Sequence, residues 1–233
     1  MIKKVLLIFA VLLFSNSACM AFELDSTKEG QYQKKVMEIG FNLLNTNRIE
    51  KRTIFKYKDD SWSKEVNAYA SSLDKSVTVL KGLMPYLEND AELAGVLAHE
   101  IAHQQDFYKG YFRMLAMAFT PKKYEQKADK IAVDYMVKAG YNPVAIIIVL
   151  NKILGQTTSD YGASHPMATK RLAYIYEYLY KKYPAYLVDN EYKDNVYYQN
   201  FLLTSKDARK KIREDIEKQE KQGKEIPVSN TKK

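Results

Sequence analysis

Apolar residues follow helical spacing over most of this 233-residue chain. Positions three and four apart share one face of a helix, so this spacing predicts helices with one buried face. The predicted helices begin at Ser26, Asn89, Thr120, Asn142, Pro166 and Ser205. The first runs to about Leu44, with an apolar face of Tyr32, Val36, Ile39 and Leu43. The helix after Pro166 has an apolar face of Leu172, Ile175, Tyr176 and Leu179.

Residues 52–80 show a different pattern, with short runs rich in β-branched and aromatic residues. Two of these runs, Val66–Ser71 and Val77–Leu80, are separated by a polar turn, which predicts a β-hairpin. We therefore expect two or three short strands here and a predominantly helical α+β fold overall.

Two of the predicted helices carry clear start signals. Asn89 is a good N-cap residue, and Glu92 stands three residues later, in the position of a capping box. Thr120 is also a good cap, Pro121 suits the first helical position, and Gly140 ends that helix.

The helix after Asn89 contains His99-Glu100-Ile101-Ala102-His103, which uses two of the three histidines of the chain. In the H-E-x-x-H pattern two imidazoles lie one helical turn apart and can bind the same metal ion. Glu100 would stand beside the open coordination position, where it can take a proton from a water molecule. The alternative is a pair of hydrogen-bonded histidines in a buried helix, because so short a pattern also arises by chance.

A catalytic zinc site takes three protein ligands, so a third ligand is expected downstream. Glu125 is the candidate, and Asp129 lies one turn later on the same predicted helix. The carboxylate nearer the metal would bind it, and the other would accept a ring N–H from a ligating histidine and fix its tautomer. The alternative is a solvated charged face, because the surrounding residues include Lys122, Lys123, Lys127 and Lys130.

Three ordered stretches of the chain resemble the HtpX/BepA type of zinc metallopeptidase, a family that includes the CAAX prenyl proteases. The first stretch, residues 90–103, contains H-E-x-x-H, and the second, residues 125–135, contains Glu125 and Asp129. The third is Ser164-His165-Pro166, followed by Arg171. The segment Asn67-Ala68-Tyr69-Ala70 also resembles the family's N-A-F-A segment.

The resemblance implies a zincin-like domain with a small sheet before the H-E-x-x-H helix, and one Zn²⁺ held by His99, His103 and Glu125. Glu100 would pass a proton from water to the leaving amine of a peptide, while zinc polarises the scissile carbonyl. The strand edge at 67–70 would pair with an extended substrate.

Several roles stay open at this point. His165 could donate a hydrogen bond to the oxyanion or could be a fourth zinc ligand. Arg171 could be that donor or could form a salt bridge with Asp129 or another helix carboxylate. Asn67 could contact substrate or could satisfy nearby backbone at the end of the strand.

The chain departs from the family pattern in two places. Only 21 residues separate His103 from Glu125, so Gly110 and the apolar run Tyr111–Phe119 have to return the chain to the site quickly. The glycine-rich turn before the family's edge strand is missing, and the chain reads Ser71-Ser72-Leu73-Asp74-Lys75-Ser76 instead. These departures concern the shape of the substrate groove rather than the metal site.

Residues 1–21 have the pattern of a secretory signal peptide. Lys3 and Lys4 precede an apolar run, Val5–Phe14, which is shorter than the ~20 residues of a membrane span. Cys19 is the only cysteine and resembles the lipidated first residue of a bacterial lipoprotein, whereas cleavage after Ala21 is the alternative. We expect a periplasmic protein, which a lipidated Cys19 would attach to the outer membrane.

The rest of the chain is long enough for one domain, predicted at residues 22–203, followed by a charged and partly disordered tail at 204–233. The formal net charge is +8, but no aromatic–basic repeat indicates nucleic-acid binding. By analogy, we expect an endopeptidase that acts on misfolded or misassembled cell-envelope proteins. The competing hypothesis is a latent or non-proteolytic holdase or assembly factor that keeps the zinc site.

Overall fold

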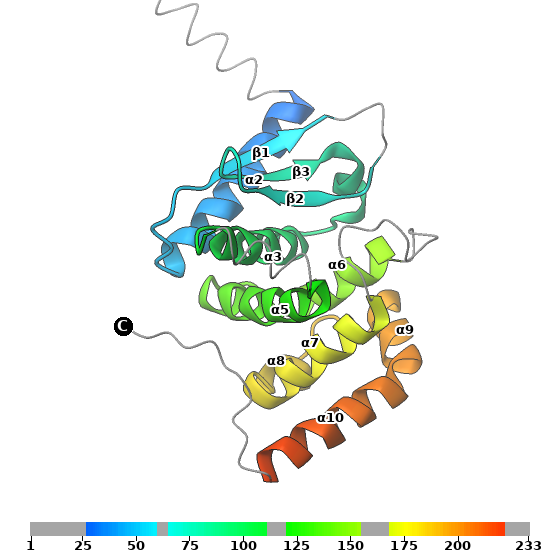
Figure 1. Ribbon diagram of the computed structural model, residues 1–233. Coiled ribbons are helices and arrows are strands. Elements are labelled where there is room, and N and C mark those ends of the chain that lie inside the picture. Colours follow the sequence, from blue (N-terminus) through cyan, green and yellow to red (C-terminus); the bar gives the residue numbers. More distant parts are fainter. Residues whose placement is uncertain (1–26, 60–64, 111–119, 155–167, 222–233) are drawn as a thin grey trace, which may run out of the picture.

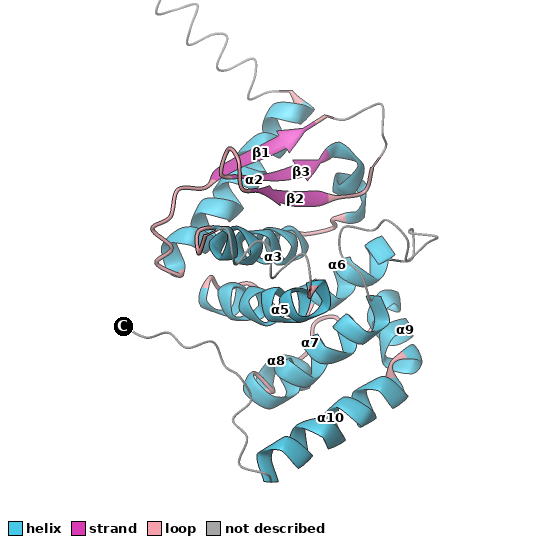
Figure 2. Cartoon of the chain, viewed as in Figure 1, coloured by secondary structure: helices cyan, strands magenta, loops and turns pink. Residues whose placement is uncertain are grey.

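The computed structural model describes residues 27–59, 65–110, 120–154 and 168–221. Helices make up most of the described residues, and the strands lie together at one end of the folded structure (Figure 2). The helices are α2 (Lys28–Thr46), the 3₁₀ helix η1 (Lys81–Tyr86), α3 (Asp90–Phe107), α5 (Pro121–Lys138), α6 (Ala145–Leu154), α7 (Ala168–Lys182), α8 (Ala185–Val188), α9 (Val196–Thr204) and α10 (Lys206–Lys221). The predicted α+β class is therefore confirmed.

The three strands form one small sheet in the order β1-β3-β2, made of β1 (Ile54–Lys58), β3 (Ser76–Leu80) and β2 (Ala68–Ser71). The predicted hairpin is present, because β2 pairs antiparallel with β3, while β1 pairs with β3 in parallel. The central strand β3 is buried along its whole length. Because β3 lies between β1 and β2, strand β2 is at an edge of the sheet.

Helix α3 is the centre of the fold, and 14 of its 18 residues are buried. It lies between the sheet and α5 (Figure 1), and it also packs against α2 and α6. The Asn89 side chain caps it by accepting from the Glu92 backbone N–H at 3.0 Å, as predicted. The Glu92 carboxylate does not close a capping box on Asn89, because it accepts from the Glu88 N–H and binds Lys152 of α6.

The other predicted helices are present, with small shifts at their ends. Helix α2 is capped by Thr27, whose Oγ accepts from Gly30 N–H at 3.0 Å, and Ser26 lies outside the described residues. Gly140 has a φ of +80°, the left-handed conformation that suits a glycine just after α5. On α7 the apolar face is buried except for Tyr176, which is half-buried.

Residues 206–221 of the predicted tail form α10, which packs against α7. Arg213 of α10 donates to both carboxylate oxygens of Glu177 on α7, and the Arg209 guanidinium lies 4.5 Å from the centre of the Tyr176 ring. The predicted domain boundaries stay predictions. Within the described ranges, no helix combines the length and the apolar character that a transmembrane span needs.

Candidate metal centre

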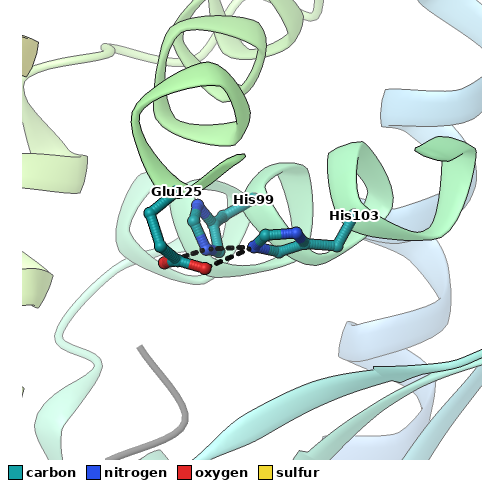
Figure 3. A group of neighbouring side chains, drawn as sticks. All are labelled: His99, His103 and Glu125. Atoms are coloured by element: carbon teal, nitrogen blue, oxygen red, sulfur yellow. Dashed lines mark hydrogen bonds and ion pairs between the residues drawn. The ribbon is translucent and has the colours of Figure 1, made fainter. Parts of the chain in front are cut away.

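The two histidines of H-E-x-x-H share one buried face of α3. Their positions one helical turn apart bring the Nε2 atoms of His99 and His103 to 3.0 Å from each other. Both side chains are buried, with 5% and 7% of their surfaces exposed. In Figure 3 the two rings converge on the same point as Glu125.

Glu125 comes from the first turns of α5, which packs along α3. Its Oε1 lies 3.1 Å from His103 Nε2, and its Oε2 lies 3.5 Å from His99 Nε2 (Figure 3). Donor atoms around a tetrahedral zinc ion, at bond lengths near 2.0–2.1 Å, stand roughly 3.3 Å apart. The spacing of these two imidazoles and one carboxylate therefore fits the ion, and the donor set is one that zinc prefers.

Asp129 lies one turn after Glu125 and is 1% exposed. Its Oδ1 is 2.9 Å from His99 Nδ1, so it can accept the Nδ1–H and leave Nε2 free for a metal. Burial lowers the pKa of His99, but hydrogen bonds to Asp129 and Glu125 outweigh this effect and raise the pKa to about 10. The negative potential that draws a proton to His99 equally favours a metal cation.

Arg171 of α7 holds both acidic residues of α5. Its Nε and NH2 groups donate to the two oxygens of Asp129 at 2.9 and 2.7 Å, and NH1 lies 2.9 Å from Glu125 Oε2. Burial would raise the pKa of Asp129, but the guanidinium charge outweighs it and lowers that pKa below its usual range. Of the two alternatives for Arg171, the structure contains the salt bridge with Asp129. Arg171 thus fixes Glu125 through Oε2, while Oε1 is the glutamate oxygen closer to a histidine Nε2.

With both histidines neutral, as metal binding requires, the charges of this cluster do not balance without a divalent cation. Glu100, Glu125, Asp129 and Arg171 are all at most 5% exposed. Three carboxylates and one guanidinium carry a formal charge of −2 when the histidines are neutral. Buried charge that is left uncompensated is costly, and a divalent cation would bring this sum to zero.

A family comparison agrees with this geometry. The model of peptidase family M48 matches residues 31–115 and 107–179, which together span more than half of the chain. The chain belongs to peptidase family M48. This is a family of metallopeptidases, and the cluster of His99, His103 and Glu125 is the candidate metal site in this member. No curated protein sequence matches the chain.

Glu100 occupies the position next to the first histidine ligand and is 4% exposed. Together with His99 it borders a cavity between α3 and α6, so a molecule bound there would meet both side chains. Burial lowers the pKa of Arg171, but the charge of Asp129 and its hydrogen bond outweigh this effect and raise that pKa, and Glu100 is close enough to contribute. In this M48 peptidase, Glu100 therefore borders the same cavity as His99 of the candidate metal site.

The predicted substrate strand, residues 67–70, overlaps β2 and begins at the same cavity. Asn67 and Ala68 border the cavity, whereas Tyr69 points outward and is 37% exposed. The Asn67 amide donates to Glu65 Oε1 at 2.8 Å, and its backbone carbonyl accepts from Leu80 N–H. This side-chain partner of Asn67 is a carboxylate rather than backbone, and the predicted contact of Asn67 with substrate stays a prediction.

His165 and Cys19 lie outside the described residues, so their predicted roles stay predictions. The contact of Arg171 with Glu125 agrees with the expected alternative of a salt bridge to Asp129 or another helix carboxylate. The cavity could not be predicted from the sequence, because the residues of its wall on α6 are apolar and have the pattern of ordinary core.

Proposed function

We propose that the chain is a zinc-dependent endopeptidase of the HtpX/BepA type, which hydrolyses misfolded or misassembled proteins of the cell envelope. The observation that carries the proposal is the buried Glu100 beside His99, His103 and Glu125, at the border of a cavity. A holdase has no need for a proton acceptor in that position. The intact arrangement therefore favours hydrolysis over the non-proteolytic alternative.

The residues divide the work of hydrolysis as follows. When bound, zinc would act as a Lewis acid on the scissile carbonyl and lower the pKa of water toward ~7. Glu100 accepts the proton of the attacking water and returns it to the amine nitrogen as the peptide bond breaks. Asp129 holds His99 in the tautomer that exposes Nε2, and Arg171 keeps Glu125 and Asp129 in place. His165 is the remaining sequence candidate for the oxyanion donor.

An extended, unfolded segment is the substrate that suits the edge strand. Strand β2 pairs only with β3 among the described strands and begins beside Glu100. A peptide that adds to such an edge is bound through its main chain, so recognition depends little on side chains. This mode of binding suits an enzyme that acts on many unfolded proteins.

We further propose that the protein works in the periplasm, attached to the outer membrane through lipidated Cys19. The support is in the sequence alone, where Lys3 and Lys4 precede the apolar run Val5–Phe14. Cell fractionation and labelling with a radioactive fatty acid would test this location. Label on the wild type and none on Cys19→Ser is expected, and an unlabelled wild type would contradict lipidation.

The central experiment measures cleavage of casein and of an unfolded outer-membrane protein together with zinc content. Wild type should cleave both and contain about one zinc ion per chain, and a chelator should stop cleavage. Glu100→Gln should keep zinc but lose cleavage by about 10³-fold or more, because the proton acceptor is removed. The matched control is Glu38→Gln, the same change on the exposed side of α2.

The outcomes separate the hypotheses. Glu38→Gln should cleave like wild type. A wild type that binds zinc and prevents aggregation without cleaving, and whose activity survives Glu100→Gln, would support the holdase instead. A wild type that binds no zinc would refute the metal centre itself.

A further inference from the structure

A small apolar cavity adjoins the candidate metal centre. It has a volume of about 70 Å³ and borders His99 and Glu100 on one side. Most of the remaining lining is aliphatic and comes from β2 and the residues before it, η1, α3 and α6. It includes Val66, Ala68, Leu83, Val96, Val149 and Ile153. Apart from Asn67 and the charged residues of the metal centre and its partners, the lining is apolar.

The size of the cavity is limited by a close approach of two helices. Gly95 lies one turn before His99 on α3, and a Cβ at this position would be 3.3 Å from both Cα and Cβ of Ile146 on α6. Helix α6 therefore packs directly on the α3 backbone beside the cavity. The buried ion pair of Lys152 with Glu92, at 2.8 Å, ties the same two helices together nearby. This wall cannot move away easily to admit a larger group.

We propose that this cavity binds a substrate side chain next to the scissile bond, and that it selects aliphatic groups of valine to leucine size over aromatic and charged ones. The inference rests on the proposed function. A group in the cavity would be held within reach of Glu100 and of a carbonyl at the metal. The cavity, rather than the edge strand, then decides where an unfolded chain is cut.

The volume supports a preference for aliphatic groups. An engineered apolar cavity of ~150 Å³ in another protein accommodates benzene, with six carbon atoms. A cavity half that size has room for the three or four carbons of an isopropyl or isobutyl group, but not for a benzyl group. A charged side chain would lose its hydration without a new partner in the far part of the cavity, which is unfavourable.

Two measurements test the proposal on the zinc-loaded, full-length protein. The first maps the residues on both sides of every cut in unfolded casein, which also shows whether the selected residue precedes or follows the bond. The second measures the affinity of three hydroxamates that carry hydrogen, an isobutyl group or a benzyl group on the carbon next to the chelating group. The binding measurement does not depend on turnover.

We expect the isobutyl hydroxamate to bind at least tenfold more tightly than the other two, since each buried methylene contributes up to about fourfold. Valine, leucine and isoleucine should dominate one of the two positions that flank the cuts. Ile153→Ala enlarges the cavity and should raise the affinity for the benzyl compound at least tenfold. Ile212→Ala, the same change on α10 away from the cavity, should leave the order of affinities unchanged.

Failure of this inference differs from failure of the proposed function. Cuts or hydroxamate binding without an aliphatic preference, or a preference that Ile153→Ala does not change, would overturn the role of the cavity and leave the peptidase intact. The absence of both cleavage and hydroxamate binding would overturn the peptidase proposal, and the cavity inference with it.

Discussion

Asp129→Asn tests how the metal centre is held together. The substitution preserves the shape of the side chain but removes a charge that is 1% exposed. Asp129 Oδ1 lies 2.9 Å from His99 Nδ1, and both carboxylate oxygens accept from Arg171. The amide oxygen can still accept from His99 and from one guanidinium nitrogen, but the amide NH₂ then faces the Arg171 Nε–H, so two donors oppose each other and the site is held less firmly.

When a metal-ligating histidine loses the carboxylate that accepts its ring N–H, metal binding typically weakens by about 10–100-fold, or ~1.4–2.7 kcal/mol. Zinc at 100 times the wild-type Kd would stabilise the wild type by ~2.7 kcal/mol, whereas a variant with about 30-fold weaker binding would gain only ~0.9 kcal/mol. For a domain of this size, the difference corresponds to a zinc-induced rise in Tm that is smaller by roughly 4–7 °C.

The assay is a zinc titration against a chromophoric chelator, with thermal unfolding recorded with and without zinc. The quantity to compare is the rise in Tm that zinc produces in each variant, because Asp129→Asn also changes the stability of the metal-free protein. Asp134→Asn is the matched control, since it lies on the same helix and accepts from Tyr178, Tyr183 and Lys182 away from the metal site. Zinc should raise the Tm of Asp134→Asn by as much as it raises that of the wild type.

An unchanged zinc affinity in Asp129→Asn would refute this reasoning. It would mean that His99 adopts the required tautomer without Asp129, and that the carboxylate serves only to neutralise Arg171. A similar loss in Asp134→Asn would indicate a general effect of α5 rather than a contact with His99.

Two further predictions concern the scaffold around the site. Gly40→Ala should lower the free energy of unfolding by roughly 1–3 kcal/mol in a urea titration, because a Cβ there would be 2.6 Å from the Phe55 ring; an unchanged midpoint would contradict this packing. Lys152→Met leaves Glu92 buried without its cation and should cost roughly 3–5 kcal/mol in the same assay, whereas adding Glu92→Leu should recover much of that loss. A double variant no more stable than Lys152→Met would show that the pair contributes little beyond packing.

Much of the local structure could be predicted because its causes are local. Asn89 caps the helix that carries the histidines, and Gly140 ends α5 in a left-handed conformation. The spacing of His99 and His103 places both rings on one face of any helix, whatever packs against it. The β-branched and aromatic runs within residues 66–80 were likewise enough to predict the hairpin, because a polar turn separates them and turn formation is local.

The choice between Glu125 and Asp129 depended on packing. Both carboxylates project from the same face of α5, so sequence alone could not say which one lies nearer the histidine Nε2 atoms. The position of α5 along α3 brings Glu125 to them and leaves Asp129 at Nδ1 of His99. Arg171 also reached these acids through tertiary structure, since α7 is far from them in the chain.

The sequence by itself therefore determined the longer helices, the hairpin and the residues able to bind a metal, because hydrogen bonding and periodicity within a helix or hairpin act over a few residues. The short helices η1, α8 and α9 were not predicted. Only the tertiary structure decided which carboxylate faces the histidines, how the buried charges pair and how large the cavity beside Glu100 is. These properties depend on distances between helices, such as the contact of Gly95 with Ile146, and such distances arise from the packing of residues that are far apart in the chain.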